Sequence, residues 1–178
     1  MSHFNRYETE RLILKPTDQE DAEFILALCN TPKWIQNIGD RNIRSVEDAE
    51  RYIIAKHIPQ FARLGYGNYT MIRKSDQQKV GSAGLYDRDG LSGIDIGFAL
   101  LPEYEGMGYA YEASLKVKSI AIEEYGLRSI SAITTQTNLG SQKLLVKLGL
   151  EFKKYLKLPG DSEELMYYLL ELDDAQSI

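Results

Sequence analysis

The sequence predicts an α+β, or mixed α/β, fold in which helices cover a largely antiparallel sheet. Short segments with strand character gather in the middle and at the C-terminal end of the chain, and turn residues separate them. Between them lie segments in which apolar residues recur every three or four positions, the spacing of one helix face. Together these segments amount to about six or seven strands and about four helices.

The chain opens with a strand and a helix. Residues 11–15 form a predicted strand that Pro16 ends, because proline has no amide hydrogen for a sheet ladder. Thr17 and Glu20 have the spacing of a capping box, which predicts a helix over residues 22–28.

A second helix follows a predicted loop. The Asn-Thr-Pro run at residues 30–32 ends the first helix, and we expect a loop from there as far as Gly39. Ser45 and Asp48 then repeat the pattern of a helix N-terminus. The helix that they open should reach about His57 or beyond, with Pro59 near its end.

The rest of the chain alternates strands with helices. Polar turns at residues 75–78, 89–90 and 159–162 separate the strands, and Gly126 and Gly149 are predicted to end the helices. The predicted strands cover residues 69–73, 80–86, 94–101, 129–134, 152–158 and 165–172, and the helices cover residues 108–125 and 141–148.

The composition indicates an ordinary globular protein. Of the 178 residues, 43% are hydrophobic and 26% are charged, and the formal net charge is -5. That length, without a repeat or a Gly/Ser-rich linker, predicts one domain over residues 1–178. Because lysine and arginine are spread thinly, we expect no nucleic-acid partner and favour a cationic or amine-bearing one.

The sequence also bears on location and on metals. No apolar run approaches the roughly 20 residues of a membrane span, and the first residues lack the apolar stretch of a signal peptide. The single cysteine, Cys29, cannot form an internal disulfide, which suits a reducing compartment. We therefore expect a cytoplasmic protein with no membrane partner. Two histidines and one cysteine give no ligand spacing, so no metal is expected.

A glycine-bearing turn predicts an anion site. The strand over residues 94–101 leads through residues 102–105 to Gly106 and Gly108, where a helix begins. Such a turn presents unpaired backbone N–H groups beside the positive end of the helix dipole, which suits a phosphate. The alternative is a plain strand, turn and helix in which the glycines only make the turn.

The strand before this turn has one nearly bare face. Asp95, Gly97 and Ala99 point to that face, and a bare strip lets a thin ligand lie against the strand. Two nucleotide-binding patterns do not fit this region. Residues 108–110, Gly-Tyr-Ala, lack the Lys-Ser/Thr ending of a P-loop, and the three-glycine dinucleotide fingerprint is absent.

Four short motifs lie along the chain. They are Thr-Glu-Arg-Leu-Ile-Leu at residues 9–14, Glu-Gly-Met-Gly-Tyr-Ala at 105–110, Gly-Tyr-Ala-Tyr-Glu-Ala at 108–113, and Asn-Leu-Gly-Ser at 138–141, with Leu-Gly at 148–149. In this order they resemble the GNAT superfamily of N-acetyltransferases. The second resembles its acetyl-coenzyme A signature, Q/R-x-x-G-x-G/A. The others are similar to the branch that includes the ribosomal-protein alanine acetyltransferases, and the resemblance covers nearly the whole chain.

The resemblance implies a fold and an activity. The fold is a GNAT-like mixed, mostly antiparallel sheet, and the activity is direct transfer of an acetyl group from acetyl-CoA, the cosubstrate, to a primary amine without an acyl-enzyme. The amine belongs to a small molecule or to a protein N-terminus, and the protein is expected to be a monomer or a homodimer. The implied acetyl-CoA-binding residues are Phe98, Ala99, Leu100, Glu105, Gly106, Met107, Gly108, Tyr109, Ala110, Asn138 and Ser141.

The sequence departs from the family pattern in three places. Glu105 stands where the family has Gln or Arg, and its carboxylate is expected to point to solvent, away from a pyrophosphate. Leu145 stands where many members carry a tyrosine that protonates the leaving thiolate, so a tyrosine acid is ruled out there. Leu150 follows Gly149 where the family has phenylalanine.

Two catalytic residues are expected. Asp95 lies where family members often hold a carboxylate, so we expect it to remove the proton of the amine; the alternative is a solvated carboxylate or one paired with a neighbouring cation. Ser141 is the expected acid for the thiolate; the alternative is an early-helix serine that satisfies the local backbone. Asn138 contacts the pantetheine, caps the next helix, or does both. A backbone N–H within residues 98–100 is the expected oxyanion donor.

The acceptor and the activity itself leave alternatives open. Trp34 and residues 37–41 are expected near the acceptor, although a buried anchor of the first helices explains Trp34 better. The main alternative to an enzyme is a non-catalytic acyl-CoA-binding sensor or interaction module, which Glu105 and the missing tyrosine motivate. The acidic composition argues against a ribosome-associated structural protein.

Overall fold

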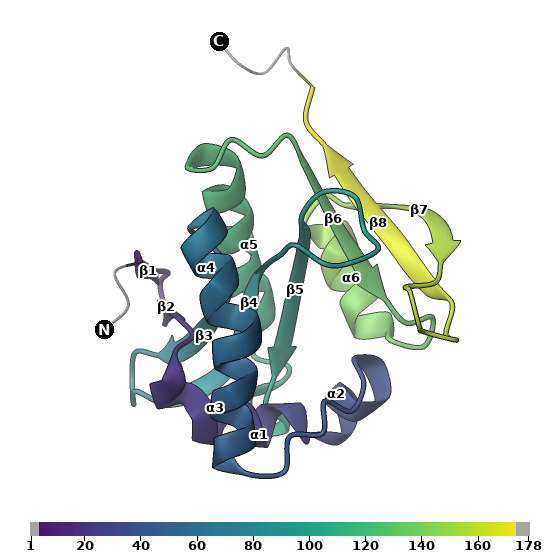
Figure 1. Cartoon of the computed structure of the whole chain (residues 1–178). Helices are drawn as coiled ribbons and strands as arrows, with labels where there is room; N and C mark the ends of the chain where they lie inside the picture. The colour runs from purple at the N-terminus through teal and green to yellow at the C-terminus, as the bar shows by residue number, and fades with distance from the viewer. Residues whose placement is uncertain (1–3, 174–178) are drawn as a thin grey trace. The chain divides into compact units, whose positions relative to one another are not determined.

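The computed structural model describes residues 4–173 and contains a mixed, mostly antiparallel sheet (Figure 1). The strands are β1 (Tyr7–Glu8), β2 (Leu12–Pro16), β3 (Asn68–Arg73), β4 (Lys79–Tyr86), β5 (Asp95–Leu100), β6 (Ser129–Thr134), β7 (Glu151–Leu156) and β8 (Leu165–Glu171). Their order in the sheet is β1-β2-β3-β4-β5-β6-β8-β7. The predicted fold class is confirmed, with eight strands in place of the six or seven expected.

The helices form between the strands as the apolar spacing predicts, with one addition. They are α1 (Ala22–Cys29), α2 (Pro32–Asn37), α3 (Val46–Tyr52), α4 (Ile58–Leu64), α5 (Tyr109–Glu123) and α6 (Leu139–Lys147), with shorter turns η1 (Gln19–Asp21), η2 (Ile53–His57) and η3 (Pro102–Tyr104). Within residues 4–173, no helix has both the length and the apolar character needed to cross a bilayer.

Contacts between residues divide the chain into two compact units. The first comprises residues 4–84 and 98–113, and the second comprises residues 85–97 and 114–173. β4, β5 and α5 contribute residues to both units. The organisation of the chain as one domain over residues 1–178 stays a prediction.

The first unit contains an antiparallel sheet of β1 to β4. β2 pairs with β3, with Leu14 opposite Met71, and both side chains are fully buried. β3 pairs with β4 across the predicted turn at residues 75–78. A Cβ on Gly81 would lie 2.3 Å from the Ala99 carbonyl oxygen, so only glycine lets the chain come this close. β1 was not predicted, because two residues are too few to show an alternating pattern.

The chain enters α1 through the capped turn η1. The Asp18 side chain accepts a hydrogen bond from the Glu20 N–H, and the Asp21 side chain accepts one from the Asp18 N–H. The capping box therefore begins at Asp18, one residue later than predicted. Thr17 instead shares a 2.9 Å hydrogen bond between its hydroxyl and that of Thr70. A carboxylate is an equally favoured cap residue, so the sequence spacing alone was ambiguous.

A short helix, α2, occupies part of the segment predicted as a loop. The Thr31 side chain accepts a hydrogen bond from the Trp34 N–H, and Pro32 takes the first helical turn, where its missing N–H has no partner to lose. The Asn-Thr-Pro run therefore ends one helix and opens the next. The prediction of a loop over residues 32–37 was wrong for this reason.

α3, η2 and α4 follow one another without a break as one long helical rod (Figure 1). Ser45 caps the rod as predicted, its side chain accepting a hydrogen bond from the Asp48 N–H. The rod continues past Pro59 to Gly65, which has a left-handed φ of 84°. The turn before the proline, η2, is a π-helix, and its wider geometry accommodates a residue that cannot donate an N–H. The helix reaches beyond His57 as predicted, but Pro59 lies one full turn and more before its end.

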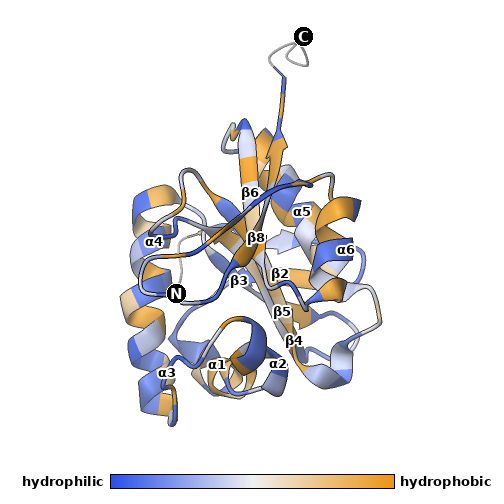
Figure 2. Ribbon diagram, turned by 90° about the vertical axis from the view of Figure 1, so that its right-hand side faces the viewer, coloured by the Kyte–Doolittle hydropathy of each residue, from blue (hydrophilic) through white to orange (hydrophobic). Residues whose placement is uncertain are grey.

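Apolar side chains of α1 and of the rod form a core cluster in the first unit. Figure 2 shows the apolar character of α1 in its colouring. Trp34 packs against this cluster while half-buried, which agrees with its interpretation as an anchor of the first helices. The cluster consists of Ala22, Phe24, Ile25, Leu28, Cys29, Ile43, Ala49 and Ile53.

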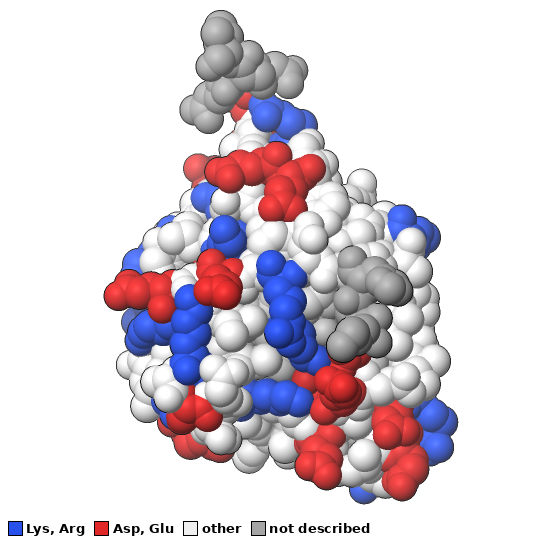
Figure 3. All heavy atoms as spheres, turned by 90° about the vertical axis from the view of Figure 1, so that its left-hand side faces the viewer, with Lys and Arg blue, Asp and Glu red and all other residues white. Residues whose placement is uncertain are grey.

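A buried carboxylate pairs with two lysines where β2 leads into α1. The Asp21 side chain has no exposed surface and lies 2.8 Å from the Lys15 ammonium and 2.7 Å from that of Lys79. Burial alone would raise the pKa of Asp21, but hydrogen bonds from Lys15 and Lys79 outweigh it and lower the pKa. Elsewhere the charges are more exposed, and Figure 3 shows basic and acidic side chains interspersed on one face.

Replacing this carboxylate should destabilise the fold strongly. Asp21→Ala removes the fully buried partner of the Lys15 ammonium, which is 6% exposed, and leaves it only Asp18 at 2.8 Å, so the free energy of unfolding should fall by about 3 kcal/mol. Urea unfolding at pH 7 measures this difference. Because the pKa is lowered in the folded state, the stabilisation by Asp21 is present at neutral pH and is lost as the pH falls through that lowered pKa.

Glu8→Ala is the matched control. Glu8 pairs with Lys74 at 2.8 Å, but its side chain is 67% exposed, so this change should leave the free energy of unfolding nearly unchanged. Equal losses for the two variants would contradict a special role for the buried pair.

The second unit contains the parallel pair of the sheet. β5 runs parallel to β6 with Asp95 opposite Ser131, and β6, β8 and β7 continue antiparallel. A parallel pair requires a crossover connection, and α5 lies in the chain between these two strands. Val117 and Ile120 of α5 are buried, as the helical spacing predicted for that segment.

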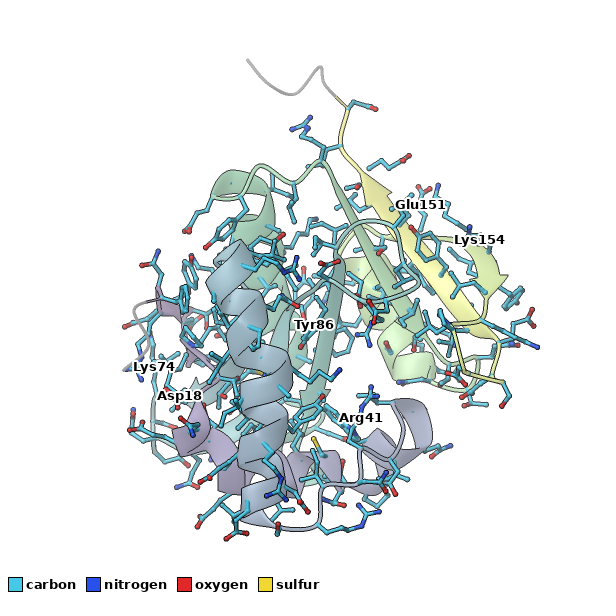
Figure 4. All side chains as sticks on the ribbon, in the orientation of Figure 1. Asp18, Arg41, Lys74, Tyr86, Glu151 and Lys154 are labelled. Atoms are coloured by element: carbon cyan, nitrogen blue, oxygen red, sulfur yellow. The ribbon has the colours of Figure 1, made fainter. Side chains whose placement is uncertain are left out.

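The C-terminal strands end the sheet with an exposed edge. β6 and α6 are in contact, and β8 lies between β6 and β7. Glu151 and Lys154 lie on β7, the outermost strand, and both are exposed (Figure 4). The predicted turn at residues 159–162 joins β7 to β8, with Gly160 at a φ of 77°.

Candidate functional site

The glycine-bearing turn forms as the sequence predicted. β5 ends at Leu100, η3 and Glu105 follow, and α5 begins at Tyr109. Gly106 and Gly108 have φ values of 74° and 84°, in the left-handed region that favours glycine. We call residues 106–110 the amide loop, because its backbone N–H groups are its main chemical feature.

The N–H groups of the amide loop have no partners. Within residues 4–173, no hydrogen bond uses the backbone N–H of any residue from 106 to 110. The first N–H groups of any helix are unpaired. Here the unpaired run begins at Gly106, three residues before the first residue of α5. Gly106, Met107 and Gly108 are also exposed. This run of free donors beside a helix N-terminus fits an anion such as a phosphate.

Aromatic and charged side chains support the segment that leads into the amide loop. The Arg73 guanidinium carbon lies 4.9 Å from the centre of the Tyr104 ring, and an Arg73 nitrogen donates to the Tyr109 hydroxyl at 3.4 Å. Glu105 accepts a hydrogen bond from the Lys33 ammonium at 2.6 Å. The Glu105 carboxylate is therefore paired with a lysine of α2, where the sequence predicted only that it would point to solvent.

Asp95 does not lie on an open strip. It is 1% exposed at the start of β5, and Gly97 is covered by the Tyr86 ring, which a Cβ would approach to 3.0 Å. Figure 4 labels this tyrosine. The nearly bare face predicted for the strand is thus covered in its first half, while residues 98–100 remain half-exposed.

The Asp95 carboxylate pairs with an arginine that the sequence analysis did not single out. The Arg88 guanidinium donates to both carboxylate oxygens at 3.2–3.4 Å. Burial raises the pKa of Asp95 to about 6, and the charge and hydrogen bonds of Arg88 only partly oppose this. Asp95 is therefore mostly ionised at neutral pH and is a stronger base than an ordinary carboxylate. Both alternatives for Asp95, base and ion-pair partner, agree with this geometry.

Asn138 is the N-cap of α6. Its side-chain oxygen accepts a hydrogen bond from the Ser141 N–H at 3.2 Å. That bond fixes the amide nitrogen on the other side, and within residues 4–173 neither this nitrogen nor the Ser141 hydroxyl has a partner. Both groups therefore keep a donor for a ligand.

Leu145 and Cys29 are not placed to take part in catalysis. Leu145 is buried in α6 at 1% exposure, so the position of the family tyrosine is filled by an apolar contact. Cys29 is 2% exposed at the end of α1, and burial raises the pKa of its thiol to about 12. A thiol with that pKa is a poor nucleophile at neutral pH. Within residues 4–173, no group of three or more His, Cys, Asp or Glu is placed to hold a metal ion.

Comparison with known families decides the class of the protein. A family model described as an acetyltransferase (GNAT) domain matches residues 11–151. The chain belongs to the GNAT acetyltransferase family. The match includes β2, the amide loop and α6, so the GNAT region contains every candidate site residue.

The GNAT relatives include two Bacillus subtilis (strain 168) proteins. The uncharacterized N-acetyltransferase YoaA is 28% identical over 155 residues, which are 84% of this chain and 85% of that protein. The uncharacterized N-acetyltransferase YjdG is 36% identical over 86 residues, which are 48% of this chain and 51% of that protein.

Solved GNAT structures share the fold. The ribosomal L7/L12 α-N-protein acetyltransferase RimL, solved with coenzyme A, has a TM-score of 0.80 at 16% identity, over 95% of this chain and 99% of that one. The ribosomal-protein-S5-alanine acetyltransferase from Vibrio fischeri has a TM-score of 0.72 at 16% identity, over 96% and 98% of the two chains. At such identities the likeness shows the GNAT fold alone.

Sequence reasoning found the free N–H groups of the amide loop but missed the side chains that contact the candidate site residues. Arg88 and Asp95 flank the predicted Asp-Gly turn, and pairing across that turn was a usable signal. Lys33 and Arg73 come from distant segments, and no pattern in the sequence connects them with the amide loop. The roles of Asp95, Ser141 and residues 98–100 stay predictions.

Proposed function

We propose that this protein is an N-acetyltransferase that moves an acetyl group from acetyl-CoA directly to a primary amine. The observation that carries the proposal is the unpaired run of N–H groups over residues 106–110. Five free donors beside a helix N-terminus suit the diphosphate of coenzyme A, whose charge is negative. Membership of the GNAT family supports the same reading.

Each unit offers a further group that the family resemblance assigns to acetyl-CoA: residues 98–100 in the first unit and Asn138 in the second. The unpaired amide nitrogen of Asn138 is a donor for a carbonyl of the pantetheine arm. A backbone N–H of residues 98–100 would donate to the thioester oxygen as it gains negative charge, which is the role of an oxyanion donor.

Transfer requires two proton movements. The amine nitrogen attacks the thioester carbon, a C–N bond forms, and the C–S bond breaks to release the coenzyme A thiolate. Asp95 accepts the proton that the amine loses, and its 1% exposure favours a relay through water over direct contact. Ser141 donates its hydroxyl proton to the thiolate and recovers one from water. The buried Cys29 thiol supports a mechanism without an acyl-enzyme.

The acceptor is a primary amine, either of a small molecule or of a protein N-terminus. The net charge of -5 favours a cationic acceptor by long-range attraction. The solved relatives named as ribosomal-protein acetyltransferases motivate the protein N-terminus as one class to test. We further propose a cytoplasmic location, a single domain, and a monomer or homodimer.

Titration calorimetry with coenzyme A tests the binding half of this proposal. One molecule of coenzyme A should bind each chain, and the heat should be lost when the ligand is pantetheine, which lacks the diphosphate. No detectable heat with coenzyme A or acetyl-CoA would remove the proposal. Binding without turnover on any amine would favour the sensor or interaction module, which the Lys33–Glu105 pair in place of the family residue still motivates.

The pH dependence of kcat/KM should reveal the protonation of Asp95. With an N-terminal amine of pKa about 7.7–8.0, log kcat/KM should rise with unit slope up to that pKa, because only the neutral amine attacks. Below pH about 6 the slope should double, since Asp95 becomes protonated as well. Profiles measured from pH 5 to 9 check this, and Asp95→Asn should keep unit slope throughout its acid limb. A wild-type profile with unit slope down to pH 5 would remove Asp95 as the titrating base.

A further inference from the structure

We propose that Arg11, held by Glu112, is a positioning residue that sets the direction of the amide-loop donors and thereby the affinity for acetyl-CoA. The inference rests on the proposed function and adds two residues to it. Both belong to motifs that the sequence analysis singled out but to which the mechanism assigns no role. Arg11 and Glu112 lie 101 residues apart in the sequence and meet in the first unit.

Glu112 fixes the start of β2 and the first turn of α5 to each other. One of its carboxylate oxygens accepts from the Arg11 backbone N–H at 2.8 Å and from the Thr9 hydroxyl at 2.6 Å. The other accepts from the Arg11 guanidinium at 2.7 Å. With three donors on one carboxylate, the Arg11 side chain is held in a single orientation.

Held in this way, Arg11 reaches the amide loop. A second guanidinium nitrogen donates to the Met107 carbonyl oxygen at 2.9 Å. A third would lie 3.3 Å from a Cβ on Gly108, and the guanidinium carbon is 4.5 Å from the centre of the Tyr109 ring. Arg11 therefore contacts Met107 and Tyr109 of the loop and occupies the space beside Gly108 that a Cβ would approach.

The contact with Met107 determines where one donor points. The Met107 C=O and the Gly108 N–H belong to one peptide group, which is planar and trans, so the two bonds point in opposite directions. Because Arg11 holds the C=O toward itself, the Gly108 N–H points away from Arg11. Without that bond, this peptide can turn by rotation about ψ of Met107 and φ of Gly108, and the missing Cβ of Gly108 lowers the resistance to that rotation.

The pair acts through geometry more than through charge. The Glu112 carboxylate offsets the Arg11 charge, so the two together add little net attraction for a diphosphate. Arg11→Lys is therefore a sharp test: lysine keeps the charge but loses the planar fork that bonds Glu112 and Met107 at once. Attraction by charge predicts that this variant binds normally, and positioning predicts that it does not.

The experiment measures coenzyme A affinity by calorimetry for the wild-type protein, Arg11→Lys, Glu112→Gln and a control. Both test variants should bind about 10- to 100-fold more weakly with unchanged stoichiometry. The KM for acetyl-CoA should rise by the same factor while kcat stays within about twofold of the wild type. The control, Arg51→Lys, changes an arginine that is 71% exposed on α3, and its affinity should equal that of the wild type.

Three outcomes separate the possibilities. Wild-type affinity in both Arg11→Lys and Glu112→Gln overturns the inference and leaves the proposed function intact. A fall in stoichiometry and kcat at constant affinity and KM indicates only a loss of folded protein, and also overturns it. If Arg11→Lys does not fold, Glu112→Gln alone decides the matter. Failure of the proposed function is distinct, because the wild-type protein itself would then bind no coenzyme A, or would bind it without turnover on any amine.

Discussion

Asp95→Asn should reduce kcat by about 10²–10⁴, the contribution of a general base. Asparagine keeps the size of the side chain and one acceptor for Arg88, but it cannot take a proton. The rate of coenzyme A release at saturating acetyl-CoA and amine measures the effect. Affinity for coenzyme A should change little, because no contact of Asp95 with the amide loop is part of the proposal.

The melting temperature of Asp95→Asn separates a role for Asp95 as the base from a merely structural role. Its pKa of about 6 lies above the ordinary value of 3.8, so the folded protein holds the proton more tightly than the unfolded chain does. Ionisation of Asp95 therefore lowers stability as the pH rises from about 4 to about 6, and at pH 8 the full cost is present. Asp95→Asn should melt no lower than the wild type at pH 8.

Asp161→Asn is the control for this change, because Asp161 is exposed in the turn between β7 and β8. It should retain wild-type kcat. Unchanged turnover in Asp95→Asn would leave water alone as the acceptor of the proton. A large drop in melting temperature together with lost activity would make Asp95 a structural partner of Arg88.

Gly108→Val should weaken coenzyme A binding by about 100-fold or more. A β-branched residue is strained at the left-handed φ of 84°, and its Cβ would lie 3.3 Å from an Arg11 nitrogen. The backbone strain and the close approach to Arg11 are relieved only if the peptide groups around Gly108 rotate. That rotation turns at least one N–H away from the diphosphate. Loss of one or two hydrogen bonds to a charged group accounts for the factor. Calorimetry with coenzyme A measures it.

Gly160→Val is a control for backbone strain. Gly160 has a φ of 77° in the turn between β7 and β8, and a Cβ there meets no atom within 4 Å. The two variants should lose similar stability, but Gly160→Val should bind coenzyme A as the wild type does. Equal loss of affinity in both would mean that strain anywhere in the chain weakens binding, and that the amide loop has no particular role.

The sequence predicted the sheet well because its signals are local. The strands from β3 to β8 have alternating or apolar runs bounded by turn residues, and each appears within about two residues of its predicted bounds. The errors lie where two readings of one signal compete. The Asn-Thr-Pro run both ends α1 and begins α2, and Pro59 sits inside a helical rod because a π-turn precedes it.

The site was only partly predictable for a different reason. The left-handed glycines and the free N–H groups follow from local backbone chemistry, and the sequence contains that information. The Arg88–Asp95 and Lys33–Glu105 pairs depend on which surfaces the fold brings together. The burial that raises the pKa of Asp95 likewise arises from tertiary packing, so alternation along a strand could not reveal it.

The Lys33–Glu105 pair explains how the chain tolerates its departure from the family signature. An unpaired carboxylate beside a diphosphate would repel it, but the Lys33 ammonium lies 2.6 Å from Glu105 and offsets its charge. The Lys33 side chain is 68% exposed, so this pairing contributes little to stability.

The most direct test incubates the protein with acetyl-CoA and a panel of amines that includes peptides with free N-termini, amino acids and polyamines. Mass spectrometry of each acceptor, together with the amount of coenzyme A released, measures the transfer. The account predicts one acetyl group on the nitrogen of at least one acceptor class, an equal amount of released coenzyme A, and no acetyl group left on the protein. Coenzyme A that binds tightly while every acceptor keeps its original mass would contradict it.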